Sequence, residues 1–461
     1  MPLVSRTTSY LRYAWTLRSF LREPVTPEAG RDVIRRRLEN REGSFLGLVK
    51  QAVYGNLTSP YLPLLRHAGC EYGDLERTVR TAGLESALQQ LYESGVYLSV
   101  EEFKGKQEVV RSGRTFQFDR KMLNNPLLPG GIQATSSGSR SAGTVTTLNL
   151  DRTAYHASCS AVAFAAHGVW GRPTLLWMPV LPSAAGLTML LQLCKMGAPP
   201  ERWFSPVATS TVRPALSKRL ATLYVVHAGR LFGSRIPSPE FVSGEQLNVV
   251  AESLKRVLLR GRGCVVSSSP SSASRLSRFA RDAGMNLSGV TFLTGGEPLT
   301  PAKMEEVRRS GAEALNLYAF AEGGVIGLGC AGARTECDDV HLLEGTQALI
   351  QRRREIAFGG GQVDALLFTS LHERAAKILL NVESGDFGVH EVRNCGCGLE
   401  EAGLCRHLHS IRSFDKLTGE GMTFVGTDLV RIIEQVLPAR FGGSPTDYQM
   451  LETEDAASRT R

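Results

Sequence analysis

The spacing of hydrophobic and polar residues changes along the chain. Up to about residue 120, apolar positions recur at helical spacing, most clearly in Phe45–Tyr54 and Leu84–Leu98. From about residue 130 to residue 330, short apolar runs alternate with amphipathic stretches. The first region is therefore predicted to be mainly helical, and the second to alternate between strands and helices.

The second region contains four predicted buried strands and four predicted helices. The strands are Pro173–Leu181, Thr222–Val226, Gly263–Ser267 and Val290–Leu293, and the helices are Thr153–His167, Ala184–Lys195, Ser243–Arg260 and Pro301–Ser310. This alternation predicts an α/β fold with a largely parallel sheet. Later in the chain, Ala365–Thr369 and Lys377–Val382 resemble strands, and Thr427–Val436 is predicted to be a helix.

A chain of 461 residues is expected to form two to three domains. The predicted parts are a helical region at 1–120, an α/β core at 121–411 and a C-terminal segment at 412–461. The core includes a subregion at 330–410 that is rich in Cys and His.

Composition narrows the class of protein. With 42% hydrophobic and 21% charged residues, the chain resembles a soluble globular protein. We find no apolar run near the ~20 residues of a membrane span and no secretory signal, so we expect a cytoplasmic protein without a membrane partner. The net charge of +8 is spread along the sequence, which argues against a nucleic-acid partner.

Residues Thr135–Thr147 combine small hydroxyl residues with glycines, between the turn Pro129-Gly130-Gly131 and the alternating segment Thr144–Leu150. Glycines let backbone N–H groups converge on one point, and hydroxyls add further donors. The run lacks the Gly-Lys-Ser/Thr ending of a Walker loop. It is either a phosphate-binding nest or a flexible polar loop.

Four downstream segments add candidate chemistry. Gly295–Leu299 follows a predicted strand, where ligands bind at the edge of a parallel sheet. Asn316–Gly324 places an aromatic residue four positions before a carboxylate in a Gly-rich turn. Ser384–Gly388 is predicted to be a turn that presents one acid, and Arg412 and Asp415 follow it.

Five short motifs occur in an order that resembles the adenylate-forming superfamily of acyl-CoA synthetases. In chain order they are Ser-Ser-Gly-Ser, Gly-Gly-Glu-Pro, Tyr-x-x-x-Glu-x-Gly, Ser-Gly-Asp and Arg-x-x-Asp. Within it, the chain is most similar to the branch of phenylacetate–CoA ligases and acyl-protein synthetases. Tyr61–Gly69 with Asp74-Leu75 is similar to that branch too, and the resemblance covers about residues 45–430. It implies a large N-terminal domain of mixed or parallel sheets flanked by helices, followed by a small C-terminal lid.

The resemblance also implies roles for individual residues. Glu322 would bind Mg²⁺, Asp386 would bind the ribose, and Arg412 would contact the ribose or the α-phosphate. The β- and γ-phosphates of ATP would be held by Ser136, Ser137, Gly138, Ser139 and Thr144, and the adenine by Gly295, Gly296, Glu297, Pro298 and Tyr318. Each residue also has an ordinary structural interpretation, such as a turn acid for Asp386, a core residue for Tyr318 or a helix cap for Glu322.

A second cluster is Cys395-Gly-Cys397 with Cys330 and His341 upstream, which suits tetrahedral zinc. The same branch carries a similar set, which resembles a structural zinc site. The fourth ligand is left open, because other thiols and imidazoles compete for it: Cys337, Cys405, His407 and His409. The alternative is a group of free thiols near a loop.

Three positions depart from the superfamily pattern. Arg140 stands where the phosphate loop commonly has a lysine, so it is expected to act as the phosphate cation. Ala321 replaces a hydroxyl residue before the glutamate. Only 46 residues follow Asp415, which predicts a shortened lid. Its adenylation lysine would be missing or replaced by one of three residues: Lys416, Arg431 or Arg440.

These observations predict an ATP-dependent ligase that forms an acyl-adenylate from a small-molecule carboxylic acid and releases pyrophosphate. The acceptor is left open among an amine, a carrier-protein thiol and CoA, with the short lid favouring the first two. Trp177, Met178 and Leu187 would line an acyl pocket or belong to the core. Two alternatives are activation of another oxyanion such as nitrite for N–N bond formation, and a non-catalytic nucleotide-binding homologue.

Overall fold

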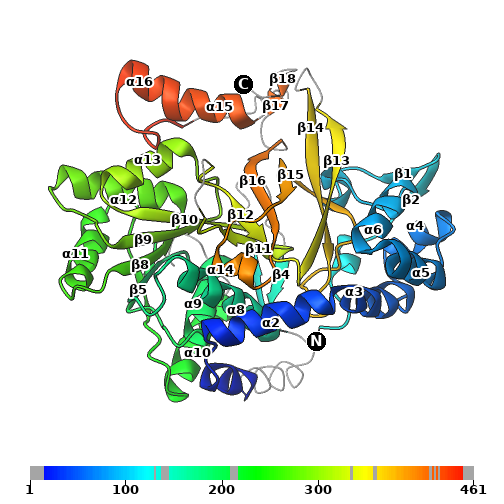
Figure 1. Ribbon diagram of the computed structural model, residues 1–461, viewed down its shortest axis with the longest axis horizontal. Coiled ribbons are helices and arrows are strands. Elements are labelled where there is room, and N and C mark those ends of the chain that lie inside the picture. Colours follow the sequence, from blue (N-terminus) through cyan, green and yellow to red (C-terminus); the bar gives the residue numbers. More distant parts are fainter. Residues whose placement is uncertain are drawn as a thin grey trace. The chain divides into compact units, whose positions relative to one another are not determined.

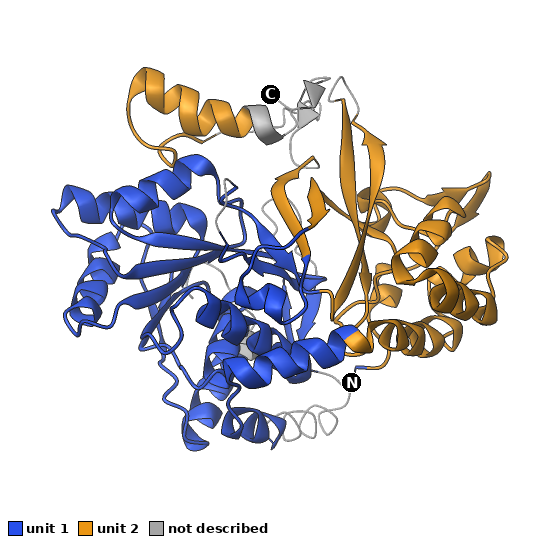
Figure 2. Ribbon diagram, viewed as in Figure 1, with its two compact units in different colours: residues 1–38, 128–343, 393–405 blue, residues 39–127, 344–392, 406–461 orange. Residues whose placement is uncertain are grey.

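The structure is a computed structural model that describes residues 15–128, 131–135, 145–207, 216–332, 336–356, 361–414, 418–419, 422–423 and 426–449. The chain divides into two compact units, which are coloured in Figure 2. Unit 1 contains residues 1–38, 128–343 and 393–405, and unit 2 contains residues 39–127, 344–392 and 406–461. The domain boundaries expected near residues 120 and 411 stay a prediction.

Unit 1 is an α/β unit whose elements alternate along the chain (Figure 1). Its strands are β3 (Ile132–Thr135), β4 (Val145–Leu148), β5 (Thr174–Trp177), β6 (Arg202–Ser205), β7 (Pro239–Phe241), β8 (Cys264–Ser268), β9 (Val290–Gly295), β10 (Glu313–Phe320), β11 (Gly324–Gly329) and β12 (Val340–Leu342). Its helices are α2 (Pro27–Glu39), α8 (Leu150–Ala166), α9 (Ala184–Lys195), α10 (Leu216–Leu231), α11 (Leu247–Leu258), α12 (Pro270–Asp282), α13 (Pro301–Arg309) and α14 (Gly398–Glu401).

The main sheet of unit 1 has the strand order β12-β11-β10-β9-β8-β5-β6-β7. Pairing is parallel from β10 through β7 and antiparallel for β10–β11 and β11–β12. The parallel strands β8 and β9 are buried along their whole length, because helices cover both faces of the sheet. This arrangement confirms the predicted α/β class with a mixed, largely parallel sheet.

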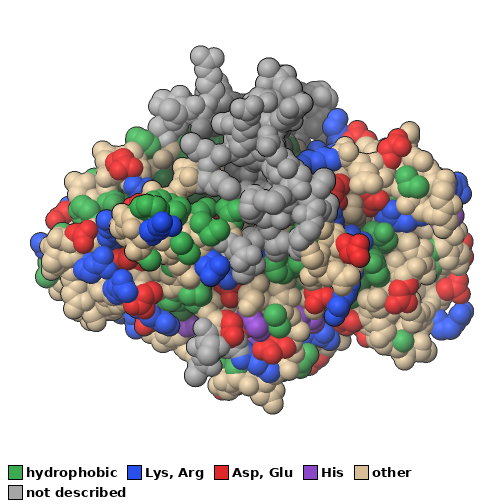
Figure 3. Space-filling view, turned by 90° about the horizontal axis from the view of Figure 1, so that it is seen from above, with side chains coloured by type: hydrophobic (Ala, Val, Ile, Leu, Met, Phe, Trp, Pro, Cys, Tyr) green, Lys and Arg blue, Asp and Glu red, His purple; other side chains and the backbone are tan. Residues whose placement is uncertain are grey.

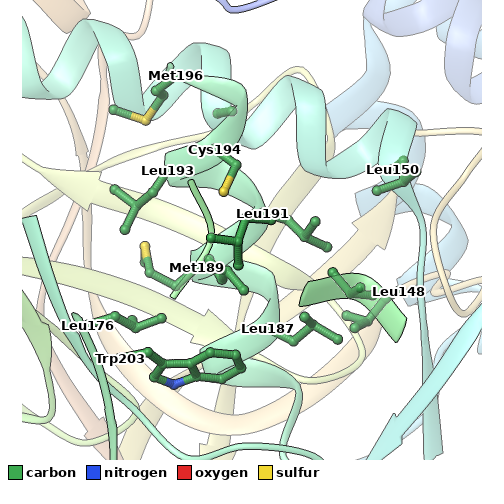
Figure 4. Close-up of a cluster of buried hydrophobic side chains, with 14 of the residues drawn as sticks. Leu148, Leu150, Leu176, Leu187, Met189, Leu191, Leu193, Cys194, Met196 and Trp203 are labelled. Carbon is green, nitrogen blue, oxygen red and sulfur yellow. The ribbon is translucent and has the colours of Figure 1, made fainter. Parts of the chain in front are cut away.

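Two hydrophobic cores lie on opposite faces of this sheet. On one face, Leu176 of β5 and Trp203 of β6 pack with the leucines of α9, such as Leu187 (Figure 4). On the other face, Leu175 and Trp177 of β5 pack with α11 and α12. Successive strand residues point to opposite faces, so Trp177 and Leu187 belong to different cores. They therefore do not line a common acyl pocket.

Unit 2 combines N-terminal helices with an antiparallel sheet of order β13-β14-β15-β16. Its helical elements are α3 (Arg41–Val49), π-helix η1 (Lys50–Tyr54), α4 (Tyr61–His67), α5 (Tyr72–Ala82), α6 (Leu84–Glu93), α7 (Val100–Phe103), 3₁₀-helix η2 (Arg120–Leu123), α15 (Gly426–Arg431), π-helix η3 (Ile432–Val436) and α16 (Leu437–Phe441). Its strands are β1 (Val109–Arg111), β2 (Arg114–Phe116), β13 (Gln347–Glu355), β14 (Gln362–Ser370), β15 (Val382–Val392), β16 (Arg406–Ser413), β17 (Thr418–Gly419) and β18 (Met422–Thr423).

Three predictions of local structure are wrong. Thr222–Val226 lies inside helix α10, where Ala221, Val225 and Val226 form a buried stripe at helical spacing. The prediction failed because a short apolar run fits the period of a strand as well as that of a helix. Lys377–Val382 is mostly irregular and joins β15 only at its end. Ser384–Gly388 lies within β15 instead of a turn, with a register shift at this point.

Charged side chains of both signs are interspersed over the described surface that faces the viewer in Figure 3. Such mixing is typical of a solvated protein surface. None of the helices in the described part of the chain combines the length and apolar character required to cross a membrane.

Candidate functional site

The carboxyl end of β9 in unit 1 approaches its neighbour β10 closely. Gly295 is paired with Leu317 in the parallel register, and a Cβ at position 295 would lie 2.9 Å from the Leu317 carbonyl oxygen. Gly296 follows with φ +89°, a left-handed conformation that favours glycine. The Glu297 carboxylate accepts a hydrogen bond from the Ser271 backbone N–H at the start of α12. The predicted Gly-Gly-Glu-Pro segment therefore lies at the carboxyl edge of the sheet, which is where ligands usually bind in open α/β folds.

Tyr318 lies at the same edge, one residue beyond the Leu317 that pairs with Gly295 at the end of β9. Glu322 follows in the turn after β10. Tyr318 is half-buried near the end of β10, with the Phe320 ring centroid 6.4 Å away. Glu322 occupies the tight turn between β10 and β11 and is half-buried. No described cationic side chain forms an ion pair with Glu322. A carboxylate of this kind suits a hard cation such as Mg²⁺.

The β3–β4 hairpin brings a third segment to this turn. Thr146 of β4 donates a hydrogen bond from its hydroxyl to the Ala321 carbonyl oxygen, at 3.1 Å. Thr135 is paired with Val145, so the two ends of the predicted phosphate loop are neighbours. The expected phosphate residues Ser136, Ser137, Gly138, Ser139, Arg140 and Thr144 lie outside the described residues.

Arg152, which the sequence pattern did not single out, lies against the same turn. It sits in the first turn of α8, where the Asn149 side chain caps the helix by accepting from the backbone N–H groups of Asp151 and Arg152. A Cβ at position 324 would collide with the Arg152 guanidinium, so Gly324 gives that side chain its space. The only sequence signal was one arginine at the start of α8, a long helix of mostly apolar and small residues.

Asp386 and Arg412 lie in adjacent strands of unit 2. Asp386 of β15 is paired with Ser413 of β16, and Arg412 with Phe387, so the two residues are one position apart in register. The positive φ of Gly385, +87°, accompanies the irregular pairing here. The expected Lys416 lies outside the described residues, and the described Arg431 and Arg440 belong to the C-terminal helices.

A Cys/His cluster forms a second candidate site, in unit 1. The ligand atoms of Cys330, His341, Cys395 and Cys397 all lie within 4.8 Å of one another. The His341 Nε2 atom is 3.1 Å from Cys397 Sγ and 3.5 Å from Cys395 Sγ. Zinc bonds of ~2.3 Å to sulfur and ~2.0 Å to nitrogen fit inside such a group. The four predicted ligands therefore converge on one point.

The surrounding groups orient these ligands. His341 Nδ1 is 2.7 Å from the Leu404 carbonyl oxygen, so Nδ1 donates and the Nε2 lone pair faces the thiols. Glu400 accepts hydrogen bonds from the backbone N–H groups of Cys395 and Gly396, which shapes the Cys-x-Cys turn.

The electrostatics of the cluster favour a thiolate. The hydrogen bond from the Cys330 thiol, reinforced by His341, holds the pKa of Cys397 well below its usual range. The pKa of Cys330 is raised, because it shares that hydrogen bond and is partly buried. Thiolates are the form of cysteine that binds metals.

The competing candidate Cys337 lies elsewhere in unit 1. Its thiol donates to the Leu299 carbonyl oxygen, at 3.2 Å, and it packs against the core beside α11 and α12. It therefore does not supply the fourth ligand in this arrangement.

Comparison with known proteins gives a fold but no close relative. No family model and no curated protein matches the sequence. An open conformation of 2-hydroxyisobutyryl-CoA ligase in complex with 2-HIB-AMP and CoA is 15% identical, with a TM-score of 0.51, over 89% of this chain and 76% of that chain. The same ligase with 2-HIB-AMP and CoA in the thioesterification state is 14% identical, with a TM-score of 0.52, over 91% and 76%.

At these identities, the likeness establishes a shared architecture, and the narrower resemblance to the phenylacetate–CoA ligase branch stays a prediction. The chain has the fold of a CoA ligase that was solved with an acyl-adenylate and CoA.

Proposed function

We propose that this chain is an ATP-dependent, adenylate-forming ligase that activates a carboxylic acid. One observation carries the proposal: Gly295–Pro298 and Tyr318–Glu322 meet at the carboxyl edge of the sheet, in the order that resembles the superfamily. The shared fold with a ligase solved with 2-HIB-AMP supports the same reaction.

In this reaction, a carboxylate oxygen attacks the α-phosphorus of ATP, and the bond to the bridging oxygen of pyrophosphate breaks. Gly295–Pro298 and Tyr318 bind the adenine, with the Tyr318 ring stacked on the base. Asp386 accepts hydrogen bonds from the ribose hydroxyls, and Arg412 supports the ribose or α-phosphate. Positioning and charge neutralisation dominate such phosphoryl chemistry.

The cations of the proposed reaction come from three places. Glu322 would hold Mg²⁺, which neutralises phosphate charge when bound. Arg140 supplies a guanidinium in the phosphate loop, and Lys416 or a C-terminal arginine takes the place of the lid lysine. The acyl group then passes to an amine, a carrier-protein thiol or CoA.

Pyrophosphate release with a panel of carboxylic acids, and with nitrite, tests this function. We expect release with at least one acid, and at least a 100-fold lower rate in Glu322→Gln. Glu313→Gln is the matched control, because Glu313 is an exposed residue at the start of β10, the strand before the turn of Glu322, and it pairs with Arg308. Release with nitrite alone would favour the oxyanion alternative. If no substrate gives release and ATP binding is unchanged in Glu322→Gln, the hypothesis that this chain is an adenylate-forming enzyme is excluded.

We also propose that Cys330, His341, Cys395 and Cys397 hold one structural zinc ion. The closed set of four convergent N and S ligands supports this role, because catalytic zinc keeps an open position. Elemental analysis of protein prepared without chelator is expected to give about one zinc per chain, and Cys397→Ser to lower it several-fold. Cys337→Ser is the control, and a zinc content far below one in the unaltered chain would contradict the proposal.

A further inference from the structure

Arg152 is a largely buried cation without a counter-ion in its unit. Its Nη1 atom is shielded from solvent and has no hydrogen-bond partner among the described residues. Burial lowers the pKa of Arg152 to about 10, so the side chain still carries its charge at neutral pH. A buried charge is stable only when something pairs with it.

The missing partner does not come from unit 1. Among its described residues, no carboxylate lies within ion-pair distance of the Arg152 guanidinium, and burial is the sole cause of its pKa shift. The remaining residues of this unit, 1–14, 129–130, 136–144, 208–215 and 333–335, contain no Asp or Glu in their sequence. Unit 1 itself therefore offers no acid partner for this positive charge.

The surroundings of Arg152 identify the ligand chemistry. The side chain packs over Gly324, in the turn that carries Glu322 and that Thr146 holds through the Ala321 carbonyl. Arg152 lies seven residues after β4 begins, and β4 directly follows the Ser/Gly-rich loop. It also lies at the N-terminus of the 17-residue helix α8, whose dipole favours an anion. These features together suit phosphate oxygens.

We propose that Arg152 binds the pyrophosphate end of ATP, over the turn Ala321–Gly324, and retains the leaving pyrophosphate there. The inference rests on the proposed function, and it adds a cation that the superfamily motifs do not include. A guanidinium can donate two parallel hydrogen bonds to one phosphoryl group.

Titration calorimetry with ATP, inorganic pyrophosphate and AMP tests the proposal on the full chain. The variants are Arg152→Met, Arg152→Lys and the control Arg260→Met, whose arginine forms an exposed ion pair with Glu201. We expect Arg152→Met to weaken the binding of ATP and of pyrophosphate about 10- to 100-fold, which corresponds to the loss of one or two charged hydrogen bonds. The binding of AMP should weaken less than about 3-fold. Arg152→Lys should keep part of the affinity, and Arg260→Met all of it.

The outcomes separate the two proposals. If the unaltered chain does not bind ATP, the proposed function fails. If it binds ATP and Arg152→Met binds pyrophosphate equally well, only the role of Arg152 is overturned. Equal losses for AMP and ATP would also overturn it, because the contact would then be to the α-phosphate. Unchanged nucleotide affinity with a raised KM for the acid would assign Arg152 to the acid substrate instead. Near-ultraviolet circular dichroism confirms that each variant is folded.

Discussion

Arg111 in unit 2 and Arg152 in unit 1 are both largely buried, yet their surroundings differ. Arg111 makes two hydrogen bonds to the Glu102 carboxylate, at 2.7 and 2.9 Å, and its other N–H groups donate to the carbonyls of Gly95, Tyr97 and Val110. Arg152 has no such acid partner among the described residues. A fully paired arginine stabilises the fold, whereas an unpaired one has free capacity for a ligand.

The paired arrangement in unit 2 extends beyond Arg111. Arg352 donates from Nε to Glu383 at 2.7 Å, and Arg354 pairs with both Glu383 and Glu101. Glu383 is fully buried, and the Tyr97 ring lies 4.0 Å from the Arg111 guanidinium carbon and 5.2 Å from that of Arg352. The three arginines line a cavity of about 290 Å³ together with Glu101 and Glu102. Glu383 is the third glutamate that balances their charge, through its ion pairs with Arg352 and Arg354.

Removal of Glu383 is expected to have the largest effect. Glu383→Ala leaves two guanidinium groups without their shared carboxylate, which should lower the free energy of unfolding by about 3–5 kcal/mol. Urea unfolding measures the change. The control Asp364→Ala removes the partner of exposed Arg353 and should cost less than about 1 kcal/mol. Equal effects in the two variants would contradict a structural role for the network.

Removal of Glu102 should cost nearly as much, about 3 kcal/mol, because Arg111 then remains buried without a carboxylate. The double variant Glu102→Leu with Arg111→Met should recover most of the loss, since it removes both charges. The coupling free energy from the four unfolding curves is the measurement. Additive losses would show that Arg111 and Glu102 act independently.

His390 in unit 2 predicts a smaller, pH-dependent effect. Burial, with the nearby Arg406 guanidinium, lowers the pKa of His390 to about 4. The unfolded chain takes up this proton below about pH 6.5, and the folded chain only below about pH 4, so stability falls as the pH drops across this window. Because His390 is partly exposed, we expect a loss of about 1 kcal/mol. His390→Gln should show a shallower slope between pH 6.5 and 4, and an unchanged slope would contradict this assignment.

Arg152→Met should have the smallest effect on stability. The substitution removes a buried charge that no described carboxylate pairs with, so the ligand-free chain should be unchanged or more stable, by up to about 1 kcal/mol. Thermal unfolding without nucleotide measures this difference. A loss near that of Glu383→Ala would show that Arg152 is a structural residue like Arg111.

Local patterns predicted several elements well. The expected helix Ala184–Lys195 coincides with α9, and the expected strands Gly263–Ser267 and Val290–Leu293 correspond to β8 and β9 within two residues at each end. In these segments the spacing of apolar residues favours one type of element, and the residues at the ends mark its limits, such as the helix cap at Ser183. The run Thr222–Val226 had no such signals, and its neighbours in α10 decided its conformation.

The candidate sites show the same contrast between what local sequence predicts and what only packing decides. Ligand chemistry, spacing and the family resemblance pointed to Cys330, His341, Cys395 and Cys397 but left the fourth ligand open, and the structure brings these four together. Spacing could not exclude Cys337, because only packing directs its thiol to Leu299 instead. Arg152 carried no motif, since the absence of a partner is a property of three-dimensional surroundings.

The sequence by itself determined the α/β class, the order of the main elements and the residue types of both candidate sites, because periodicity and ligand chemistry are local properties. Only the tertiary structure decided which cysteines converge, that Gly295 and Tyr318 share one edge of the sheet, and which buried arginines are paired. The physical reason is that charge compensation depends on contacts between residues far apart in the chain. Arg111 and Arg152 are both arginines in the sequence, and their different roles appear only once their neighbours are known.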